Sequence, residues 1–204
     1  MSLEHMLLGL LQTPASGYDL KAHFDQSVRF FWSAELSQVY PTLKRLESRG
    51  LLSSRVEKSN RGPRRKVYSL TAAGRQVLRD WVTGEPQFAD VRQGFVGQIF
   101  FLHAAADLKE SLRFVERLRQ AVQERLNTYQ RIDDAWSRGE PPYPDPGSDA
   151  GFHQRLALRG GLRLMAARLE WCDEMIAAIR RRMRRGRRVN SRKNSRLSTH
   201  RSRT

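Results

Sequence analysis

Two stretches in the second half of the chain repeat apolar residues at alternating spacings of four and three. The later stretch runs unbroken through Leu158, Leu162, Met165, Leu169, Cys172, Ile176, Ile179 and Met183. The earlier stretch has apolar residues at positions 108, 112, 115, 122, 126, 129 and 136, with breaks at Arg119 and Asp133. This spacing places the apolar side chains along one face of an α-helix, as in a coiled coil. The two stretches therefore predict two long helices that must each pack against a partner.

The segment between the two predicted helices, residues 137–149, is rich in proline and reads SRGEPPYPDPGSD. Proline disrupts a helix interior, so we expect this segment to be a connecting loop. Upstream, apolar residues from Phe88 to Leu102 indicate one further helix. The economical partners for the two long helices are each other and a second copy of the chain, which predicts a homodimer. A helical hairpin within a monomer is the alternative.

The first half predicts three helices, two strands and a fourth helix. Apolar periodicity predicts helices over residues 3–12, 18–28 and 34–49. Ser16 and Asp19 form a weak capping box at the start of the second helix. We expect the short aromatic run at 29–32 to be extended. Strand-like runs follow at 51–58 and 66–70, separated by the turn-rich segment SNRGPRR, and Thr71 can cap the fourth helix. This order is typical of a winged helix. A small α+β domain with a solvated basic loop is the alternative.

The third predicted helix has an apolar face and a polar face. Leu36, Val39, Leu43 and Leu46 cluster on the first, while Gln38, Thr42, Arg45 and Arg49 form a stripe on the second, with Ser37 and Lys44 beside it. In a winged helix such a stripe enters the major groove of DNA, where Arg pairs with guanine and Gln with adenine. Thr42 can meet a thymine methyl group or a phosphate. For Arg49, near the helix end, a solvated charge is the alternative.

The two predicted strands and the turn between them would form the wing. It offers four cations, Arg61, Arg64 and Arg65 in the turn and Lys66 at the start of the second strand. A cluster of this density suits contact with phosphates or with the minor groove. Because side chains alternate along a strand, we expect Arg61 and Arg64 to face DNA in preference to Lys66. A bare, solvated loop is the alternative.

The net charge of +16 is weaker evidence for DNA binding than it first suggests, because residues 180–204 hold 11 Arg, one Lys and no acidic residue. The rest of the chain carries only about +4. We expect the last 20 residues, the basic tail 185–204, to be disordered and to add non-specific affinity for DNA through counterion release. The alternative function that the tail favours is a non-specific nucleoid-associated or RNA-binding basic protein.

The sequence shows no phosphate-binding glycine loop, no nucleophile motif and no metal-ligand spacing among its five histidines. We therefore expect neither an enzyme nor a bound cofactor. The single cysteine, Cys172, excludes an intrachain disulfide and favours a reducing compartment. No stretch is long and apolar enough for a membrane span, so we expect a protein of the bacterial cytoplasm that associates with the nucleoid.

Four blocks of the sequence together resemble the PadR family of transcription regulators. They are MLLGLL (6–11), SGYDL (16–20), SQVYPTLKRLESRGLL (37–52) and RKVYSLTAAGRQVL (65–78), in the family's order and spacing. The third block is specific because proline inside a helix is disfavoured by about 3 kcal/mol. Residues 88–183 are similar in helix layout to the C-terminal domain of the longer subfamily, which includes AphA-like virulence activators.

The resemblance implies a homodimeric regulator, often a repressor, that binds a pseudo-palindromic operator in double-stranded DNA. It also implies that the hydroxyl of Tyr40 reaches the DNA backbone, with a half-buried core residue as the alternative. Some relatives bind flat aromatic effectors between tryptophans at the dimer interface, which makes Trp136 and Trp171 candidate effector residues. Large aromatic residues at helical spacing are more often core.

The predicted fold class is mainly α with a small β-hairpin. We expect a winged helix-turn-helix DNA-binding domain over residues 1–86 and a long-helix dimerisation domain, with room for an effector, over residues 87–184. The basic tail would then occupy residues 185–204.

Overall fold

The computed structural model describes residues 3–26, 36–59, 62–87, 93–105, 107–141 and 143–201. The chain folds as two compact units, Met1–Val91 and Arg92–Thr204. The aromatic run predicted to be extended, residues 29–32, lies outside the described residues, as do Phe88 and Val91 of the helix predicted upstream of the long pair.

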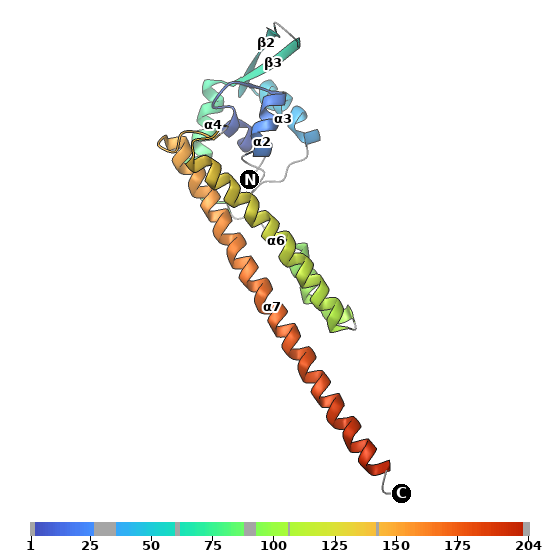
Figure 1. The fold of residues 1–204 in the computed structure, drawn as a ribbon. Helices are drawn as coiled ribbons and strands as arrows, with labels where there is room; N and C mark the ends of the chain where they lie inside the picture. Colours follow the sequence, from blue (N-terminus) through green and yellow to red (C-terminus); the bar gives the residue numbers. More distant parts are fainter. Residues whose placement is uncertain are drawn as a thin grey trace. The chain divides into compact units, whose positions relative to one another are not determined.

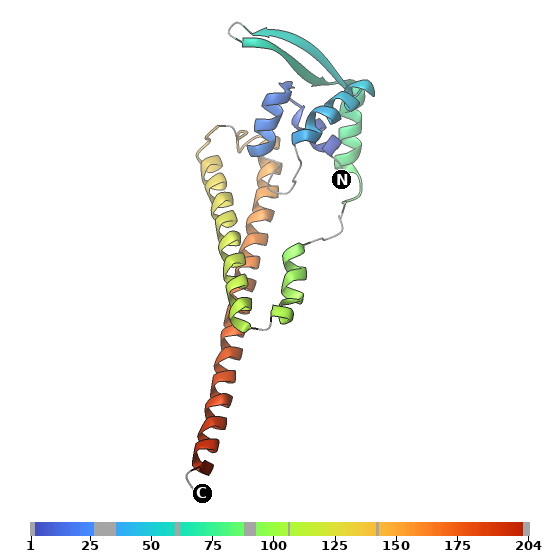
Figure 2. The ribbon, with the colours of Figure 1, turned by 90° about the vertical axis from the view of Figure 1, so that its right-hand side faces the viewer.

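The first unit contains four helices and a small sheet (Figure 1). The helices are α1 (Leu3–Leu10), α2 (Gly17–Gln26), α3 (Leu36–Ser48) and α4 (Ala72–Thr83). The strands are β1 (Ala15–Ser16), β2 (Leu52–Ser59) and β3 (Gly62–Leu70), and β2 and β3 form a long antiparallel hairpin (Figure 2). The predicted order of helices and strands is confirmed.

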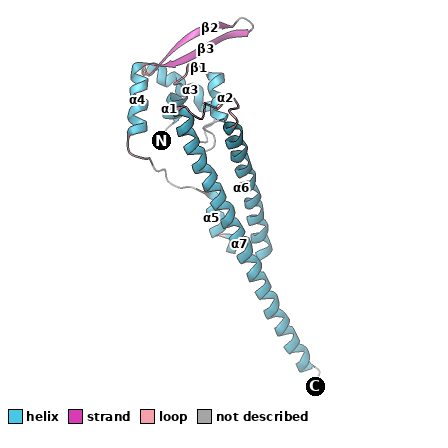
Figure 3. Cartoon of the chain, turned by 60° about the vertical axis from the view of Figure 1, so that its left-hand side comes forward, coloured by secondary structure: helices cyan, strands magenta, loops and turns pink. Residues whose placement is uncertain are grey.

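The sheet differs from the prediction in two ways. β1, which the sequence did not indicate, pairs antiparallel with β3, giving the strand order β1-β3-β2 (Figure 3). The second hairpin strand begins at Gly62 rather than at residue 66, because the pairing of β2 with β3 continues to the pair Ser59 and Gly62. Ladder hydrogen bonds thus extend into a segment whose composition predicted a turn.

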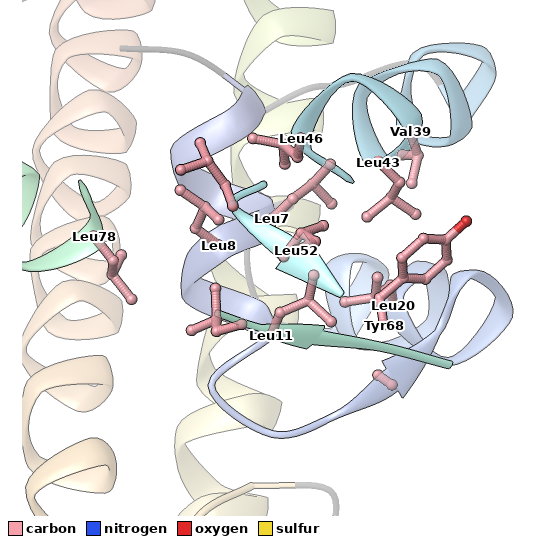
Figure 4. Packing of buried hydrophobic residues seen from close by; sticks show 13 residues of the cluster. Leu7, Leu8, Leu11, Leu20, Val39, Leu43, Leu46, Leu52, Tyr68 and Leu78 are labelled. Atoms are coloured by element: carbon pink, nitrogen blue, oxygen red, sulfur yellow. The ribbon is translucent and has the colours of Figure 1, made fainter. Parts of the chain in front are cut away.

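The core of the first unit is built from leucines of α1, α2 and α3 packed on the β-hairpin and α4 (Figure 4). Leu7 and Leu8 of α1 and Leu11 just after it contribute to the core, together with Val39, Leu43 and Leu46 of α3. The predicted apolar face of the third helix is therefore confirmed at these three positions. The buried face fixes the rotation of α3 about its axis and so decides which of its side chains face solvent.

Local signals set the ends of these helices. The backbone N–H of Ser16 donates to Asp19 Oδ2 at 3.1 Å, and the N–H of Asp19 donates to Ser16 Oγ at 3.2 Å, which confirms the capping box. Gly50 follows α3 with φ of 69°, a conformation that glycine adopts without strain. Thr71 Oγ1 accepts the N–H of Gly74 at 3.0 Å and donates to the carbonyl of Gly50 at 2.7 Å. Thr71 thus caps α4 and ties it to the end of α3.

The second unit contains α5 (Gly94–Phe100), a 3-10 turn (Leu102–Ala105) and the long helices α6 (Leu108–Ser137) and α7 (Asp149–Arg201). Asp107 caps α6, because its Oδ1 accepts the N–H of Lys109 at 2.9 Å. α6 and α7 lie side by side and antiparallel in Figure 1 and in Figure 2. The prediction that the two long helices pack on each other is confirmed.

The contact between α6 and α7 uses the predicted apolar residues. Those that are buried are Val115, Val122, Leu126, Tyr129, Trp136, Leu158, Met165, Cys172 and Ile176. Burial raises the pKa of the Cys172 thiol, as expected for a core residue. A Cβ atom on Gly161 would lie 3.1 Å from Tyr129 Cε2, so the glycine lets the tyrosine ring pack closely against α7.

The two breaks in the earlier apolar pattern are sites of ion pairs between the helices. Arg119 Nε lies 2.5 Å from Asp173 Oδ1, and Asp133 Oδ1 lies 2.9 Å from Arg155 Nε. At the far end of the pair, Arg180 Nη2 lies 2.8 Å from Glu116 Oε1. These polar pairs fix the register of α6 against α7.

The end of α7 differs from the prediction of a disordered tail after residue 184, because the helix continues to Arg201. Arginine and lysine have high helix propensity, and extending a helix that is already formed avoids the cost of nucleation. None of the helices, as far as the structure describes them, is long and apolar enough to span a membrane.

Candidate nucleic-acid interface

The solvent-facing side of α3 is offset from the stripe that helical periodicity predicted. Ser37, Gln38, Tyr40, Pro41, Lys44, Arg45, Ser48 and Arg49 are exposed. Thr42, which the sequence placed on the DNA-facing side, is only 4% exposed, so that prediction was wrong. The reason is its position three residues after Val39 and four before Leu46, both of which are core residues.

Arg45 and Arg49 share one carboxylate on α1. Arg45 Nε donates to Glu4 Oε1 at 2.7 Å, and Arg49 Nη1 donates to Glu4 Oε2 at 2.8 Å. The guanidinium of Arg45 also lies 3.4 Å from Thr42 Oγ1. The hydrogen bond from Arg45 is the first cause of a lowered pKa for Glu4. Both arginines are exposed, yet each is held on the side of α3 that faces α1.

Tyr40 lies where α3 meets the start of α2. A Cβ atom on Gly17 would be 2.5 Å from Tyr40 Cε1, so a larger residue there would displace the tyrosine ring. Tyr40 is nonetheless 58% exposed, so its hydroxyl is not enclosed in the core, although the ring packs on Gly17. Tyr18, on the first turn of α2, is also exposed. The sequence marked Tyr18 only as part of a helical pattern and missed it as a surface aromatic.

The wing cations differ in their surroundings. Arg65 Nη2 lies 3.2 Å from Glu57 Oε2, and its Nη1 lies 3.8 Å from Asp19 Oδ2. Lys66 Nζ lies 2.7 Å from Glu47 Oε2. Arg64 is exposed, and Arg61 lies outside the described residues. Among the candidate cations whose side chains are described, Lys44 and Arg64 have no carboxylate partner.

Glu47 connects α3 to both strands of the hairpin, and sequence reasoning missed it. Besides its pair with Lys66 on β3, it accepts a hydrogen bond from Ser54 Oγ on β2. The hydrogen bond from Lys66 is the largest cause of its lowered pKa. No local signal marks this role, because Lys66 lies far along the sequence. Glu47 therefore sets the wing against the helix.

The two candidate effector tryptophans are not brought together within the chain. Trp136 is 4% exposed, stacks on Tyr143 and donates from Nε1 to the carbonyl of Pro144 at 2.8 Å. Trp171 contacts the ring of Phe95. Arg155 Nη2 on α7 donates to Ser137 Oγ at 2.6 Å, which places residue 155 beside the end of α6 that carries Trp136. Trp171 lies about 24 Å further along α7. Within one chain the pair cannot enclose a single small ligand.

No group of three or more His, Cys, Asp and Glu side chains in the described parts of the chain could hold a metal ion. What the first unit offers is an exposed polar helix face beside a hairpin that bears cations. A helix of this kind and an adjacent wing are the two DNA-contacting parts of a winged helix. The fold and the surface thus define a winged-helix regulator with a helical C-terminal unit.

Comparisons with known proteins give the family. Residues 6–80 match the transcriptional regulator PadR-like family, and residues 91–180 match the virulence activator alpha C-terminal family. A probable transcriptional regulator of Mycobacterium tuberculosis is 30% identical over 88% of this chain and 98% of its own length. The negative transcriptional regulator PadR of Bacillus subtilis is 29% identical over 87% of this chain and 97% of its own. The chain belongs to the PadR-like family of transcriptional regulators.

Solved structures agree with this assignment and confirm the predicted fold class. Bacillus subtilis PadR in complex with operator DNA has a TM-score of 0.75 at 26% identity, covering 87% of this chain and 98% of that one. The same protein in complex with p-coumaric acid has a TM-score of 0.69 at 27% identity, covering 87% and 94%.

Proposed function

We propose that this regulator is a repressor that binds a pseudo-palindromic operator as a homodimer, with α3 in the major groove and the β2–β3 hairpin on the adjacent backbone or minor groove. The observation that carries the proposal is the exposed face of α3, which presents Gln38, Lys44 and Arg45 beside the hairpin. The complex of B. subtilis PadR with operator DNA supports it, and that protein's name as a negative regulator supports repression. Action on chromosomal DNA would place the protein in the cytoplasm.

The surroundings of each cation suggest its role. Lys44 and Arg64, free of carboxylates among the described residues, suit phosphates, which they would neutralise without a competing partner. Arg45, held in one orientation by Glu4, suits a base edge, because a bidentate contact with guanine needs a fixed guanidinium plane. Gln38 could read adenine, and the exposed Tyr40 hydroxyl could reach a phosphate.

The proposal of a dimer rests on apolar surface in the second unit. α5 and the following 3-10 turn contain no buried residue, and Phe100 is 74% exposed beside the exposed Phe101. On α7, Phe152, Leu156 and Leu164 are also exposed. Apolar surface of this kind marks an interaction site, and a second copy of the same unit would cover it. We accordingly assign DNA binding to residues 1–86 and dimerisation to residues 87–184.

Two α3 helices related by a two-fold axis would contact half-sites one helical turn of DNA apart, or a multiple of it. The test is to select bound fragments from random DNA at physiological salt and then to measure affinity for the consensus and for scrambled DNA. We expect an inverted repeat that is bound at least about 10³-fold more tightly than scrambled sequence. Equal binding to all fragments would contradict the proposal and favour a non-specific basic protein.

We further propose that a small organic acid regulates operator binding, because B. subtilis PadR has been crystallised with p-coumaric acid. Trp136 on α6 and Trp171 on α7 are too far apart within one protomer to meet a shared ligand, so a site at these residues would need side chains from two protomers at the dimer interface.

A further inference from the structure

The β2–β3 hairpin is fixed at one end by burial in the core of the first unit. Leu52 at the start of β2 and Leu70 at the end of β3 lie opposite each other and belong to this core. Toward the other end, β2 continues to Ser59 and β3 begins at Gly62, and Figure 1 shows this end standing clear of the helices. Core burial alone therefore does not fix the direction of the end that carries Arg64.

One side chain of α3 contacts both strands between these two ends. Glu47 Oε2 accepts a hydrogen bond from Lys66 Nζ on β3 at 2.7 Å, and Glu47 Oε1 accepts one from Ser54 Oγ on β2. Ser54 lies opposite Tyr68, two residues from Lys66, so the two donors lie on the same face of the hairpin. Lys66 Nζ also lies 5.1 Å from the centroid of the Tyr68 ring. Glu47 thus holds the hairpin at one point on each strand.

The other ion pair between the hairpin and a helix is looser. Arg65 Nη1 lies 3.8 Å from Asp19 Oδ2 on α2, and the same guanidinium is paired at 3.2 Å with Glu57 of the hairpin itself. Asp19 also accepts hydrogen bonds from the backbone N–H and the hydroxyl of Ser16. Both partners are engaged elsewhere, so Glu47 makes the closer connection between the hairpin and the helices.

The position of this connection suits a role in DNA binding better than a role in stability. Glu47 and Lys66 are both partly exposed, and an exposed ion pair contributes little to the free energy of unfolding. Gly62, however, lies four residues beyond Lys66, about 13 Å along the strand, so a small change of direction at Lys66 is amplified there. Lys44, a proposed phosphate contact, is three residues from Glu47. One helix therefore carries both a proposed DNA contact and the anchor of the wing.

We propose that Glu47 and Lys66 are positioning residues for DNA binding, which hold the wing in the direction that brings Arg64 to a phosphate while α3 lies in the major groove. Lys66, a DNA contact on the evidence of the sequence, then acts through Glu47 and does not itself bind DNA. The inference rests on the proposed function and adds the connection between its two contacts. Without this pair the wing must be ordered during binding, and that cost weakens the contact from Arg64.

The alternative is that Glu47 only offsets the charge of Lys66. A single substitution does not separate the two roles, because removing Glu47 also removes a negative charge from the proposed DNA-binding face. A double-mutant cycle does, since it compares the effect of Arg64→Gln with and without Glu47. The variants are Arg64→Gln, Glu47→Ala and the two combined. Lys44→Gln, alone and combined with Glu47→Ala, is the matched control, because Lys44 is a proposed phosphate contact outside the wing.

The full-length protein is titrated, at several salt concentrations, with a duplex that contains the selected consensus and with an unrelated duplex of the same length. We expect Arg64→Gln to reduce the salt slope by about one counterion in the otherwise unaltered protein, and by less than about half of that in Glu47→Ala. Lys44→Gln should reduce the slope by about one counterion in both. Glu47→Lys combined with Lys66→Glu reverses the pair at constant net charge and should preserve the full effect of Arg64→Gln.

An equal effect of Arg64→Gln with and without Glu47 would overturn the inference and leave Glu47 as a charge offset. So would a reversed pair in which Arg64→Gln has lost its effect, or an unaltered protein in which Arg64→Gln leaves the slope unchanged, because the wing would then not reach a phosphate. Equal loss of the Lys44 and Arg64 effects in Glu47→Ala would also overturn it, since wing direction does not govern Lys44. Failure of the proposed function is a separate result, namely selected DNA without an inverted repeat, and the cycle on unrelated DNA needs no operator.

Discussion

Glu4 on α1 accepts a hydrogen bond from Arg45 on α3 at 2.7 Å, across 41 residues of sequence. Its second carboxylate oxygen accepts Arg49 at 2.8 Å. One acid thus offsets half of the charge that two arginines bring to the proposed DNA-binding face. The same contact gives the guanidinium plane of Arg45 a defined orientation before DNA binds. Arg45 then loses less side-chain entropy when it contacts a base.

The first prediction concerns Glu4 itself. Glu4→Gln keeps the shape of the side chain but removes the charge that orients the two arginines. We expect affinity for unrelated DNA to rise, because one negative charge leaves the DNA-facing surface, and the ratio of operator to unrelated affinity to fall by about 5- to 30-fold, the equivalent of about 1–2 kcal/mol. Both affinities are measured at one salt concentration. Glu85→Gln, an equal change of charge at an exposed residue after α4, is the control and should alter neither. An unchanged ratio in Glu4→Gln would show that Glu4 does not contribute to specificity.

The second prediction tests whether Arg45 reads a base. Arg45→Ala should weaken operator binding by about 1–3 kcal/mol and relax the preference at a single position of each half-site. The measurement is a set of affinities for operators altered one base pair at a time. Arg79→Ala, on the exposed side of α4, is the control. If Arg45→Ala weakened every sequence by the same factor, Arg45 would be a phosphate contact instead.

The third prediction concerns Lys44 and Arg64, which have no carboxylate partner among the described residues. Lys44→Gln and Arg64→Gln should each weaken operator and unrelated DNA alike and reduce the salt dependence of binding by about one counterion. Affinity measured at several salt concentrations gives this slope. Lys109→Gln in the second unit serves as a control with the same loss of charge. A change in base preference without a change in slope would contradict the assignment of these residues to phosphates.

The fourth prediction is a pH dependence of stability. The pKa of Glu4 is lowered in the folded protein, chiefly by its hydrogen bond from Arg45, so the folded state favours the ionised carboxylate. The stabilisation is then fully present above the ordinary pKa of glutamate, near 4.5, and is lost as the pH falls through the lowered value. Because both arginines are largely exposed, we expect it to be worth about 1 kcal/mol or less. Urea unfolding of the unaltered protein and of Glu4→Gln should differ at pH 7 and converge towards pH 3. A constant difference across this range would show that the ion pair is not its cause.

Features with a local signal could be predicted from the sequence. Ser16 and Asp19 are three residues apart, and Gly50 lies just beyond the end of α3. The start of α2 and the end of α3 could therefore be predicted without knowledge of the fold. The same is true of the 4–3 spacing, which predicted the contact between α6 and α7 because it depends only on helical geometry.

Features that depend on contacts between distant residues could not be predicted. The roles of Glu4 and Glu47 arise from arginines and lysines on other elements, which no periodicity reveals. Thr42 was assigned to the wrong face because helical angles alone do not show how wide the buried face of α3 is. α1 packs against α3, and Thr42 is buried. Trp136 and Trp171 both lie in or beside the apolar 4–3 stretches. Because α6 and α7 are antiparallel, Trp136 lies near residue 155 of α7 and therefore far from Trp171.

The last prediction separates the basic tail from the winged helix. A chain that ends after Met183 lacks most of the arginines that follow residue 179, and both family matches end before this point. If the tail adds only non-specific affinity, the shortened protein should bind unrelated DNA more weakly. Its salt dependence should also be shallower, by about 0.9 for each phosphate that the tail neutralises in the full-length protein. Operator affinity should fall by the same factor, because phosphate contacts carry no sequence information, and α3 is intact. The base preference and the ratio of operator to unrelated affinity should therefore stay the same. Filter binding at four or more salt concentrations, with both DNAs, measures these quantities. Retention of the full slope would show that the tail does not bind DNA, and disappearance of the base preference would assign it a part in operator recognition.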